Sequence, residues 1–169
     1  DEYWTYDMFN NVIRARDKGV NLFFLSGNAV HGTEYLAPST DNRPNRTTGR
    51  LPERLFGNEQ ELMGASSYGV GYGSFLCRSP DHWIFRNTGM KENDSIPHLV
   101  GWEYHGRPAG HQSDLVVLAE TKPDPLIFGS KNLQNHISTI YTTAKGNFVF
   151  NAGTCWWVQP LAKTPAYQH

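Results

Sequence analysis

The chain has 169 residues, of which 38% are apolar, 13% aromatic and 18% charged, and its formal net charge is −1. This length is typical of one domain that buries a core without disulfides or metal ions, and so many aromatic side chains are atypical of a disordered chain. A net charge near zero argues against a nucleic-acid-binding domain, which carries a basic excess. No apolar run reaches the roughly 18 to 20 residues of a membrane span.

The first predicted element is an amphipathic helix. Apolar residues recur at helical spacing from Trp4 to Val12, which gives the segment one apolar face. Gly19 suits the left-handed position just after the end of a helix. We expect Asp1 and Glu2 to lie at the start of this helix, where carboxylates stabilise the exposed N–H groups. From spacing alone, helix capping is the simplest role for both.

A short apolar run, Val20–Leu25, follows the helix and predicts a strand buried on both faces. Because a helix followed by such a strand is half of an α/β unit, we expect a mostly parallel sheet with a further strand upstream of residue 1. Ligands bind at the carboxyl edge of open α/β sheets. We therefore expect Glu2 and Asn28 to converge on one crevice, although Asn28 alone is also typical of a turn.

The remainder of the chain is predicted to be irregular at first and then strand-rich. Residues 38–60 are rich in Asn, Arg, Thr, Pro and Gly, and predict a long irregular stretch. Strands are predicted at Ser74–Arg78, His82–Arg86, Leu99–Tyr104 and Leu115–Glu120, and a β-hairpin from Ile137–Thr143 and Asn147–Asn151.

Other residues with reactive or metal-binding side chains have a structural interpretation that is favoured over a functional one. His31, His105 and His111 lie in Gly-rich segments without a specific metal-ligand spacing, so structural or solvent-facing roles are favoured. Cys77 precedes His82 by five residues. A Cys–His nucleophile pair is nevertheless disfavoured, because Cys77 lies inside a predicted strand and not on a sharp turn.

Cysteines and glycines add little about function. Cys77 and Cys155 are too few for a secreted disulfide framework. We predict two reduced, partly buried thiols, which favours a cytoplasmic protein. The Gly69-x-Gly71-x-Gly73 segment lacks the strand–loop–helix context of a phosphate-binding loop, so we expect it to serve flexibility or close packing.

Several short motifs follow one another along the chain: Asp1-Glu2-Tyr3-Trp4, Gly19-Val20-Asn21-Leu22, Ser26-Gly27-Asn28-Ala29, His82–Gly89, Leu99–Glu103 and Phe148–Trp156. This succession resembles the C-terminal domain of the large (β) subunit of N,N-dimethylformamidase and its relatives. The resemblance covers nearly the whole chain and implies a fold like that of class I glutamine amidotransferases, without their catalytic Cys. The expected fold class is therefore α/β, a partial glutamine amidotransferase-like (flavodoxin-like) sheet with a β-rich C-terminal part.

The resemblance implies a mononuclear iron amidohydrolase. In that family two tyrosinates and the Glu of a His-Asp-Glu-Tyr-Trp motif bind Fe(III), so Glu2 is the expected metal ligand and Asn28 the expected catalytic residue. Hard oxygen ligands suit a ferric ion, which activates a carbonyl group and a bound water. The expected reaction is hydrolysis of a small N-substituted formamide to an amine and formate.

The chain departs from the family pattern in ways that predict an incomplete site. The motif's His would precede Asp1, and the two tyrosine ligands belong upstream, so they are not transferred to Tyr3 or Tyr6. His105 stands where the family's Gly-x-Glu-x-Asp-like segment has Asp. We expect residues 1–169 to be a single domain, a fragment of a larger amidotransferase-like domain that lacks its N-terminal part and is inactive alone.

An unpaired apolar edge beside Val20–Leu25 predicts tight association with the remainder of the same domain or with another subunit. The expected protein is thus a cytoplasmic oligomer that binds a small amide and neither nucleic acid nor membrane. Two alternatives stay open. The first is a non-catalytic structural or ligand-binding relative of the same fold, and the second a carbohydrate-binding module that uses Trp102, Trp156 or Trp157.

Overall fold

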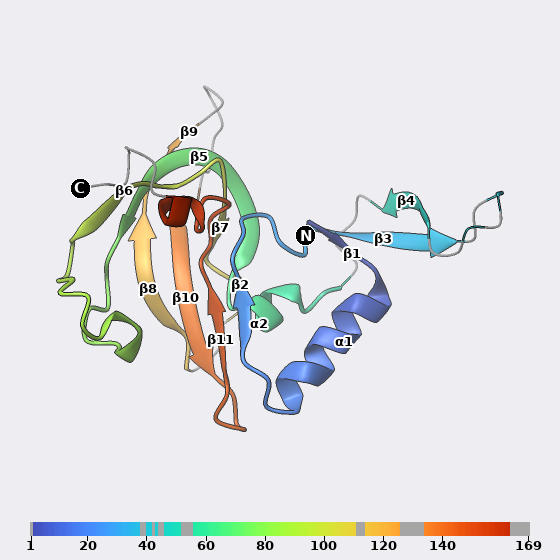
Figure 1. The fold of residues 1–169 in the computed structure, drawn as a ribbon, viewed down its shortest axis with the longest axis horizontal. Coiled ribbons are helices and arrows are strands. Elements are labelled where there is room, and N and C mark those ends of the chain that lie inside the picture. Colours follow the sequence, from blue (N-terminus) through green and yellow to red (C-terminus); the bar gives the residue numbers. More distant parts are fainter. Residues whose placement is uncertain are drawn as a thin grey trace.

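The computed structural model describes residues 2–37, 40–41, 43, 46–51, 56–110, 114–125 and 134–162. They form a strand-rich mixed α/β protein (Figure 1). In this part of the chain, the helices are too short and too polar to cross a membrane. The elements are β1 (Tyr3–Trp4), α1 (Tyr6–Asp17), β2 (Leu22–Phe24), β3 (Gly32–Ala37), β4 (Arg46–Leu51), α2 (Glu59–Met63), β5 (Ser66–Leu76), β6 (Ser95–Val100), β7 (Glu103–Gly106), β8 (Val116–Thr121), β9 (Asp124–Pro125), β10 (His136–Thr142) and β11 (Phe148–Asn151), with 3-10 turns at Trp83–Phe85 and Gln159–Ala162.

These strands form three sheets. One has the order β2-β11-β10-β8, a second has β6-β5-β7 with β9 also paired to β5, and a third has β1-β3-β4. Figure 1 shows β5 as a curved strand over the first sheet, while β3 and β4 project to one side. Among the described strands, β1 with β3 and β2 with β11 are parallel pairs, and the others are antiparallel. The prediction of a mostly parallel sheet is therefore wrong for these residues.

The predicted helix is confirmed, but it begins later than expected. Thr5 is its N-cap, with an extended backbone and a side-chain oxygen that accepts a hydrogen bond from the Met8 N–H at 3.1 Å. Phe9 is buried on the core face of α1. Trp4 lies in β1, so Glu2 precedes a strand and does not lie at the helix start. The capping role predicted for Glu2 is therefore wrong.

Strand β2 is confirmed within the Val20–Leu25 run, but its predicted burial on both faces is wrong. Phe24 is buried, whereas the side chain of Phe23 is 57% exposed. The two side chains lie on opposite faces of the strand. Phe24 is on the face that the helices cover, in the cluster with Phe9 and Met63, whereas Phe23 is on the other face. The apolar run therefore indicated a strand correctly, but not that one of its faces is exposed.

The later predictions were confirmed for the strands with the clearest pattern. Strand β8 covers most of Leu115–Glu120, β5 contains most of Ser74–Arg78, and β10 and β11 form the predicted antiparallel hairpin. Residues 38–60 are not irregular throughout, since β4 and the start of α2 fall there, while parts of that stretch lie outside the described residues.

One predicted strand is wrong, and a second is divided into parts of two strands. His82–Arg86 contains a 3-10 turn, and the His82 Nδ1 accepts a hydrogen bond from the Ile84 N–H at 3.4 Å, as an N-cap does. Leu99–Tyr104 is divided between β6 and β7 at Gly101, whose φ of +153° is favourable for glycine. The strand propensity of these aromatic and apolar residues is overridden by the His82 cap in the first segment and by the backbone conformation of Gly101 in the second.

Apolar side chains from both helices pack on the first sheet. The cluster includes Phe9 from α1, Met63 from α2 and Phe24, Tyr141 and Val149 from the strands, all buried. Full burial of one such side chain stabilises the fold by about 1.5–3 kcal/mol. The two helices and the turn after β2 are thus held against one face of the sheet. Two further clusters, centred on Phe75 and Leu118, fill the space toward β5 and β8.

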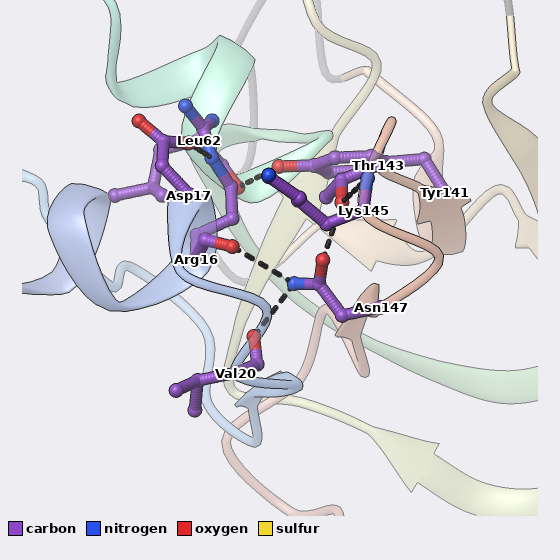
Figure 2. Close-up of polar contacts among 8 residues, drawn as sticks. All are labelled: Arg16, Asp17, Val20, Leu62, Tyr141, Thr143, Lys145 and Asn147. Atoms are coloured by element: carbon purple, nitrogen blue, oxygen red, sulfur yellow. Dashed lines mark hydrogen bonds and ion pairs between the residues drawn. The ribbon is translucent and has the colours of Figure 1, made fainter.

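A buried asparagine joins the end of α1 to the hairpin, as Figure 2 shows. Both hydrogens of the Asn147 Nδ2 are used, one on the Arg16 carbonyl oxygen at 3.1 Å and one on the Val20 carbonyl oxygen at 2.8 Å. Its Oδ1 accepts a hydrogen bond from the Thr143 hydroxyl. The Arg16 carbonyl oxygen also accepts the Gly19 N–H at 2.9 Å, so Asn147 adds a second hydrogen bond at the helix end and supplies a donor to the Val20 carbonyl oxygen.

Replacement of Asn147 by Ala is expected to destabilise the protein by about 2 kcal/mol, because the Val20 carbonyl group loses the Asn147 donor and the Thr143 hydroxyl loses its acceptor, while the Arg16 carbonyl group keeps only the Gly19 N–H. Urea unfolding measures the change in the free energy of unfolding. Lys145→Ala is the control, since the side chain of Lys145 is exposed in the same hairpin and its replacement should change stability by about 0.5 kcal/mol or less. Equal effects of the two variants would contradict the structural role of Asn147.

Candidate functional site

The turn after β2 carries the predicted catalytic residue and has an unusual backbone. Asn28 has φ of 49° and Val30 has φ of 54°, both in the left-handed region. For a β-branched residue such as Val30 this conformation is disfavoured by clashes of its side chain. Between them, the Ala29 N–H donates a buried hydrogen bond of 3.0 Å to the Nε2 of His105 in β7. A tertiary contact thus fixes the turn that presents Asn28.

His105 is fully buried, and each of its ring nitrogens has a defined role. Nε2 accepts from Ala29, so the proton resides on Nδ1, which donates to the Asn151 Oδ1 at 2.8 Å. The same oxygen accepts from the Gly153 N–H at 2.9 Å, and the Asn151 Nδ2 donates to the Met63 carbonyl oxygen at 3.3 Å. The structural role predicted for His105 is confirmed.

The beginning of the turn, at Gly27, also lies against β7. A Cβ on Gly27 would lie 2.2 Å from the carbonyl oxygen of Glu103, closer than two such atoms ever approach. That same oxygen accepts a hydrogen bond from the Cys155 N–H at 3.2 Å, and the Cys155 thiol donates to the Glu103 Oε2 at 3.6 Å. Residues 26–28, Glu103 and Cys155 therefore meet.

The Cys155 thiol is held in its protonated form. Burial raises the pKa of Cys155, and the nearby Glu103 carboxylate raises this pKa further, while hydrogen bonds from Gly27 and Ser26 oppose the shift. A neutral thiol is a weak nucleophile. Sequence reasoning used Glu103 and Cys155 only as members of motifs, and nothing in their spacing indicated that they contact each other.

Glu2 lies at the beginning of β1, and its side chain is exposed. Its carbonyl oxygen accepts hydrogen bonds from the His31 N–H at 2.7 Å and the Gly32 N–H at 3.2 Å. The rings of Tyr3 and His31 meet edge to face, with their centroids 6.3 Å apart. The structure therefore holds the backbone of Glu2 close to the turn that contains Asn28. Two other residues considered from the sequence, Asp1 for its carboxylate and His111 as a metal ligand, lie outside the described residues.

The described residues do not form a complete metal site. Nowhere in the described ranges do three or more His, Cys, Asp and Glu side chains gather in a way that could hold an ion. The carboxylate of Glu2 is a hard oxygen donor of the kind that ferric iron prefers. One carboxylate does not hold such an ion, so the donor chemistry fits iron but the donor set needs groups from elsewhere.

The Cys77–His82 nucleophile pair, which the sequence already disfavoured, is disfavoured by the structure as well. Burial is the main cause that raises the pKa of Cys77, which is fully buried and follows β5. Burial also lowers the pKa of His82, whose Nδ1 already accepts the Ile84 N–H. Cys77 and Cys155 are both free thiols, as predicted.

Close packing explains the glycine segment of β5. A Cβ on Gly71 would lie 2.5 Å from the Asp124 carbonyl oxygen, and one on Gly69 would enter the ring of Tyr104. These positions therefore require glycine for the approach of other chain segments, which confirms the packing interpretation.

The three tryptophans proposed for sugar binding do not share one exposed face. Trp157 packs in the core, with its ring centroid 5.6 Å from that of Phe75 and 5.4 Å from that of Phe150. Trp102 is exposed, whereas Trp156 is half-buried and stacks on Tyr72 at 5.1 Å. This arrangement does not favour a carbohydrate-binding module.

The described residues form a strand-rich mixed α/β protein in which β7 packs against the turn around Asn28. Residues 1–169 match the family model described as N,N-dimethylformamidase beta subunit-like, C-terminal, and the chain belongs to this family. A search among curated proteins finds no match to the chain.

Proposed function

We propose that the chain contributes Glu2 and Asn28 to the active site of an iron-dependent amidohydrolase of the N,N-dimethylformamidase type. The substrate is a small N-substituted formamide, and the products are an amine and formate. In this proposal the fold is a part of a glutamine amidotransferase-like domain. The remaining iron ligands, two tyrosinates in the family that the sequence resembles, come from the rest of the domain or from another subunit, so the chain is inactive alone.

The observation that carries the proposal is the pair of hydrogen bonds from the His31 and Gly32 N–H groups to the Glu2 carbonyl oxygen. These bonds tie the segment of the expected metal ligand to the segment of the expected catalytic residue, which lies three positions before His31. Residues that act on one substrate must be held in a fixed mutual geometry. Family membership over the full chain supports the same reaction class.

Bound ferric iron supplies a Lewis acid for the formyl carbonyl group and for a water molecule. The residues of this chain have three tasks beside it. Glu2 provides one carboxylate ligand, and the Asn28 amide provides a donor and an acceptor that orient an amide substrate. Glu103, whose backbone lies against Gly27 and whose Oε2 accepts a hydrogen bond from the Cys155 thiol, is the carboxylate that we propose to exchange a proton with water or the leaving amine.

Association with other parts of the protein is proposed from the apolar surface beside β2. Phe23, Val20 and Leu25 are 57%, 50% and 41% exposed. A 250 Å³ groove, lined by side chains that include Trp4 of β1 and Val12 of α1, runs along the same strand. Apolar surface on an open strand edge favours pairing with another chain segment. This setting fits a cytoplasmic oligomer.

Glu2→Gln is expected to lower the iron content of the full-length protein and to reduce formamide hydrolysis by about 10- to 100-fold, because a neutral amide replaces a charged ligand. Metal analysis measures the iron, and release of formate measures the reaction. Glu92→Gln is the matched control, since Glu92 is an exposed carboxylate in the turn before β6.

Two outcomes would contradict the proposal in different ways. Full iron content and full activity of the Glu2→Gln variant would show that Glu2 is not a ligand. Native full-length protein that holds no iron and hydrolyses no formamide would favour the non-catalytic relative of the same fold.

A further inference from the structure

We propose that His105 and Asn151 are positioning residues that hold Asn28 in its working orientation. The inference rests on the proposed function for the role of Asn28, but its physical basis is separate. His105 lies 76 residues from Ala29 and 46 residues from Asn151 along the chain, yet buried hydrogen bonds join all three. The result is one buried connection from β11 through β7 to the turn after β2.

The direction of each hydrogen bond in this connection is fixed. The Ala29 N–H can only donate, so the His105 Nε2 must accept and the ring proton must be on Nδ1. Nδ1 then requires an acceptor, which is the Asn151 Oδ1 at 2.8 Å. A protonated imidazole would set an N–H group against the Ala29 N–H, so the connection requires the neutral ring.

Asn151 cannot rotate its amide without loss of other contacts. Its Oδ1 faces two donors, the His105 ring and the Gly153 N–H, while its Nδ2 faces the Met63 carbonyl oxygen. Exchange of oxygen and nitrogen would place like groups against each other at every contact. Because Asn151 is fully buried, no water can compensate for such mismatches, and the observed orientation of the amide is strongly favoured.

The turn needs such an anchor. Asn28 and Val30 both have positive φ, a backbone conformation that is strained for a residue other than glycine. The strain persists when surrounding contacts over-determine the conformation, and the Ala29 N–H between the two residues is the group that His105 binds. Loss of this hydrogen bond is expected to let the turn relax and move the Asn28 amide.

His136 offers a matched control for a purely structural effect. It is a second fully buried histidine, its Nε2 donates to the Ala152 carbonyl oxygen at 3.3 Å, and its Nδ1 has no hydrogen-bond partner. A change at His136 therefore perturbs the same core without removal of the acceptor for Ala29. A role in positioning and a role in general packing thus predict different results for the two histidines.

The test compares His105→Gln, His105→Asn and His136→Gln in the full-length protein. A Gln side chain reaches the Nε2 position and keeps an acceptor for the Ala29 N–H, whereas the shorter Asn side chain keeps only the group that faces Asn151. Hydrogen exchange of the segment that contains Ala29 is measured by mass spectrometry, and kcat and KM for formamide hydrolysis are measured with it.

We expect His105→Asn to speed exchange of the Ala29 segment and to lower kcat by about 10- to 100-fold, while His105→Gln restores both. His136→Gln should leave exchange of that segment and kcat near the native values. Unchanged exchange in His105→Asn, or equal losses of kcat in His105→Asn and His136→Gln, would overturn the inference. The exchange measurement does not depend on activity, so failure of the proposed function through Glu2→Gln remains distinguishable from failure of the anchor.

Discussion

A fall in pH from 7 to 4 is expected to lower the free energy of unfolding by about 3 kcal/mol through His136 alone. The side chain of His136 is fully buried in β10, between the rings of Phe75 and Tyr104. Burial lowers its pKa from 6.5 to about 4. The Ala152 carbonyl oxygen and Glu120 oppose this shift, while the positive form of His105 would add to it.

The sign follows from the protons that each state binds. Between pH 6.5 and about 4 the unfolded chain binds a proton at His136 that the folded chain does not, so acid favours the unfolded state. The stabilisation by His136 in its neutral form is complete above pH 6.5 and is lost as the pH falls toward 4. Below that value both states are protonated and the effect of this residue no longer grows.

Urea unfolding at a series of pH values tests this expectation. Other groups also titrate in this range, so the informative quantity is the difference between native protein and the His136→Gln variant. That difference should shrink by about 3 kcal/mol from pH 7 to pH 4. A His98→Gln control, at an exposed histidine in β6, should run parallel to the native curve. A pH-independent difference for His136→Gln would show that the buried ring does not titrate as expected.

Local chemistry made part of the fold predictable. The helical spacing from Trp4 to Val12 depends on neighbours in sequence, and so does the hairpin around Lys145. Both were therefore recognisable without the structure. The exposed face of β2 was not, because a continuous apolar run looks the same whether one or both faces of the strand are covered. The segments that pack on each face of the sheet decide the exposure of Phe23, and the helices cover the face that carries Phe24.

In the candidate site, too, some features depend on local sequence and others on contacts between distant residues. Asn28 was singled out because it ends a predicted strand, and that placement needs only local sequence. Its connection to His105 and Asn151 depends on hydrogen bonds across dozens of residues. No periodicity or short motif encodes such contacts. His105 was correctly expected to be structural from its lack of ligand spacing, but the group that it supports could be identified only in the folded chain.

Gly27→Ala is expected to have a comparably large effect on stability and a direct effect on the site. A Cβ at this position would lie 2.2 Å from the Glu103 carbonyl oxygen and 2.9 Å from the Tyr104 nitrogen. Both contacts are to backbone, which cannot rotate away, so β7 or the turn must move. Overpacking of this kind costs about 3 kcal/mol, well above the gain of about 0.4–1 kcal/mol that Ala gives by restricting the unfolded chain.

Gly110→Ala is the matched control, because a Cβ there meets no atom within 4 Å. Thermal and urea unfolding should show a loss for Gly27→Ala and little change for Gly110→Ala. In the full-length protein, Gly27→Ala should also speed hydrogen exchange around Ala29, since displacement of β7 carries His105 away from the turn. Native-like stability and exchange in Gly27→Ala would mean that the turn and β7 are not in the close contact on which the Asn28 site depends.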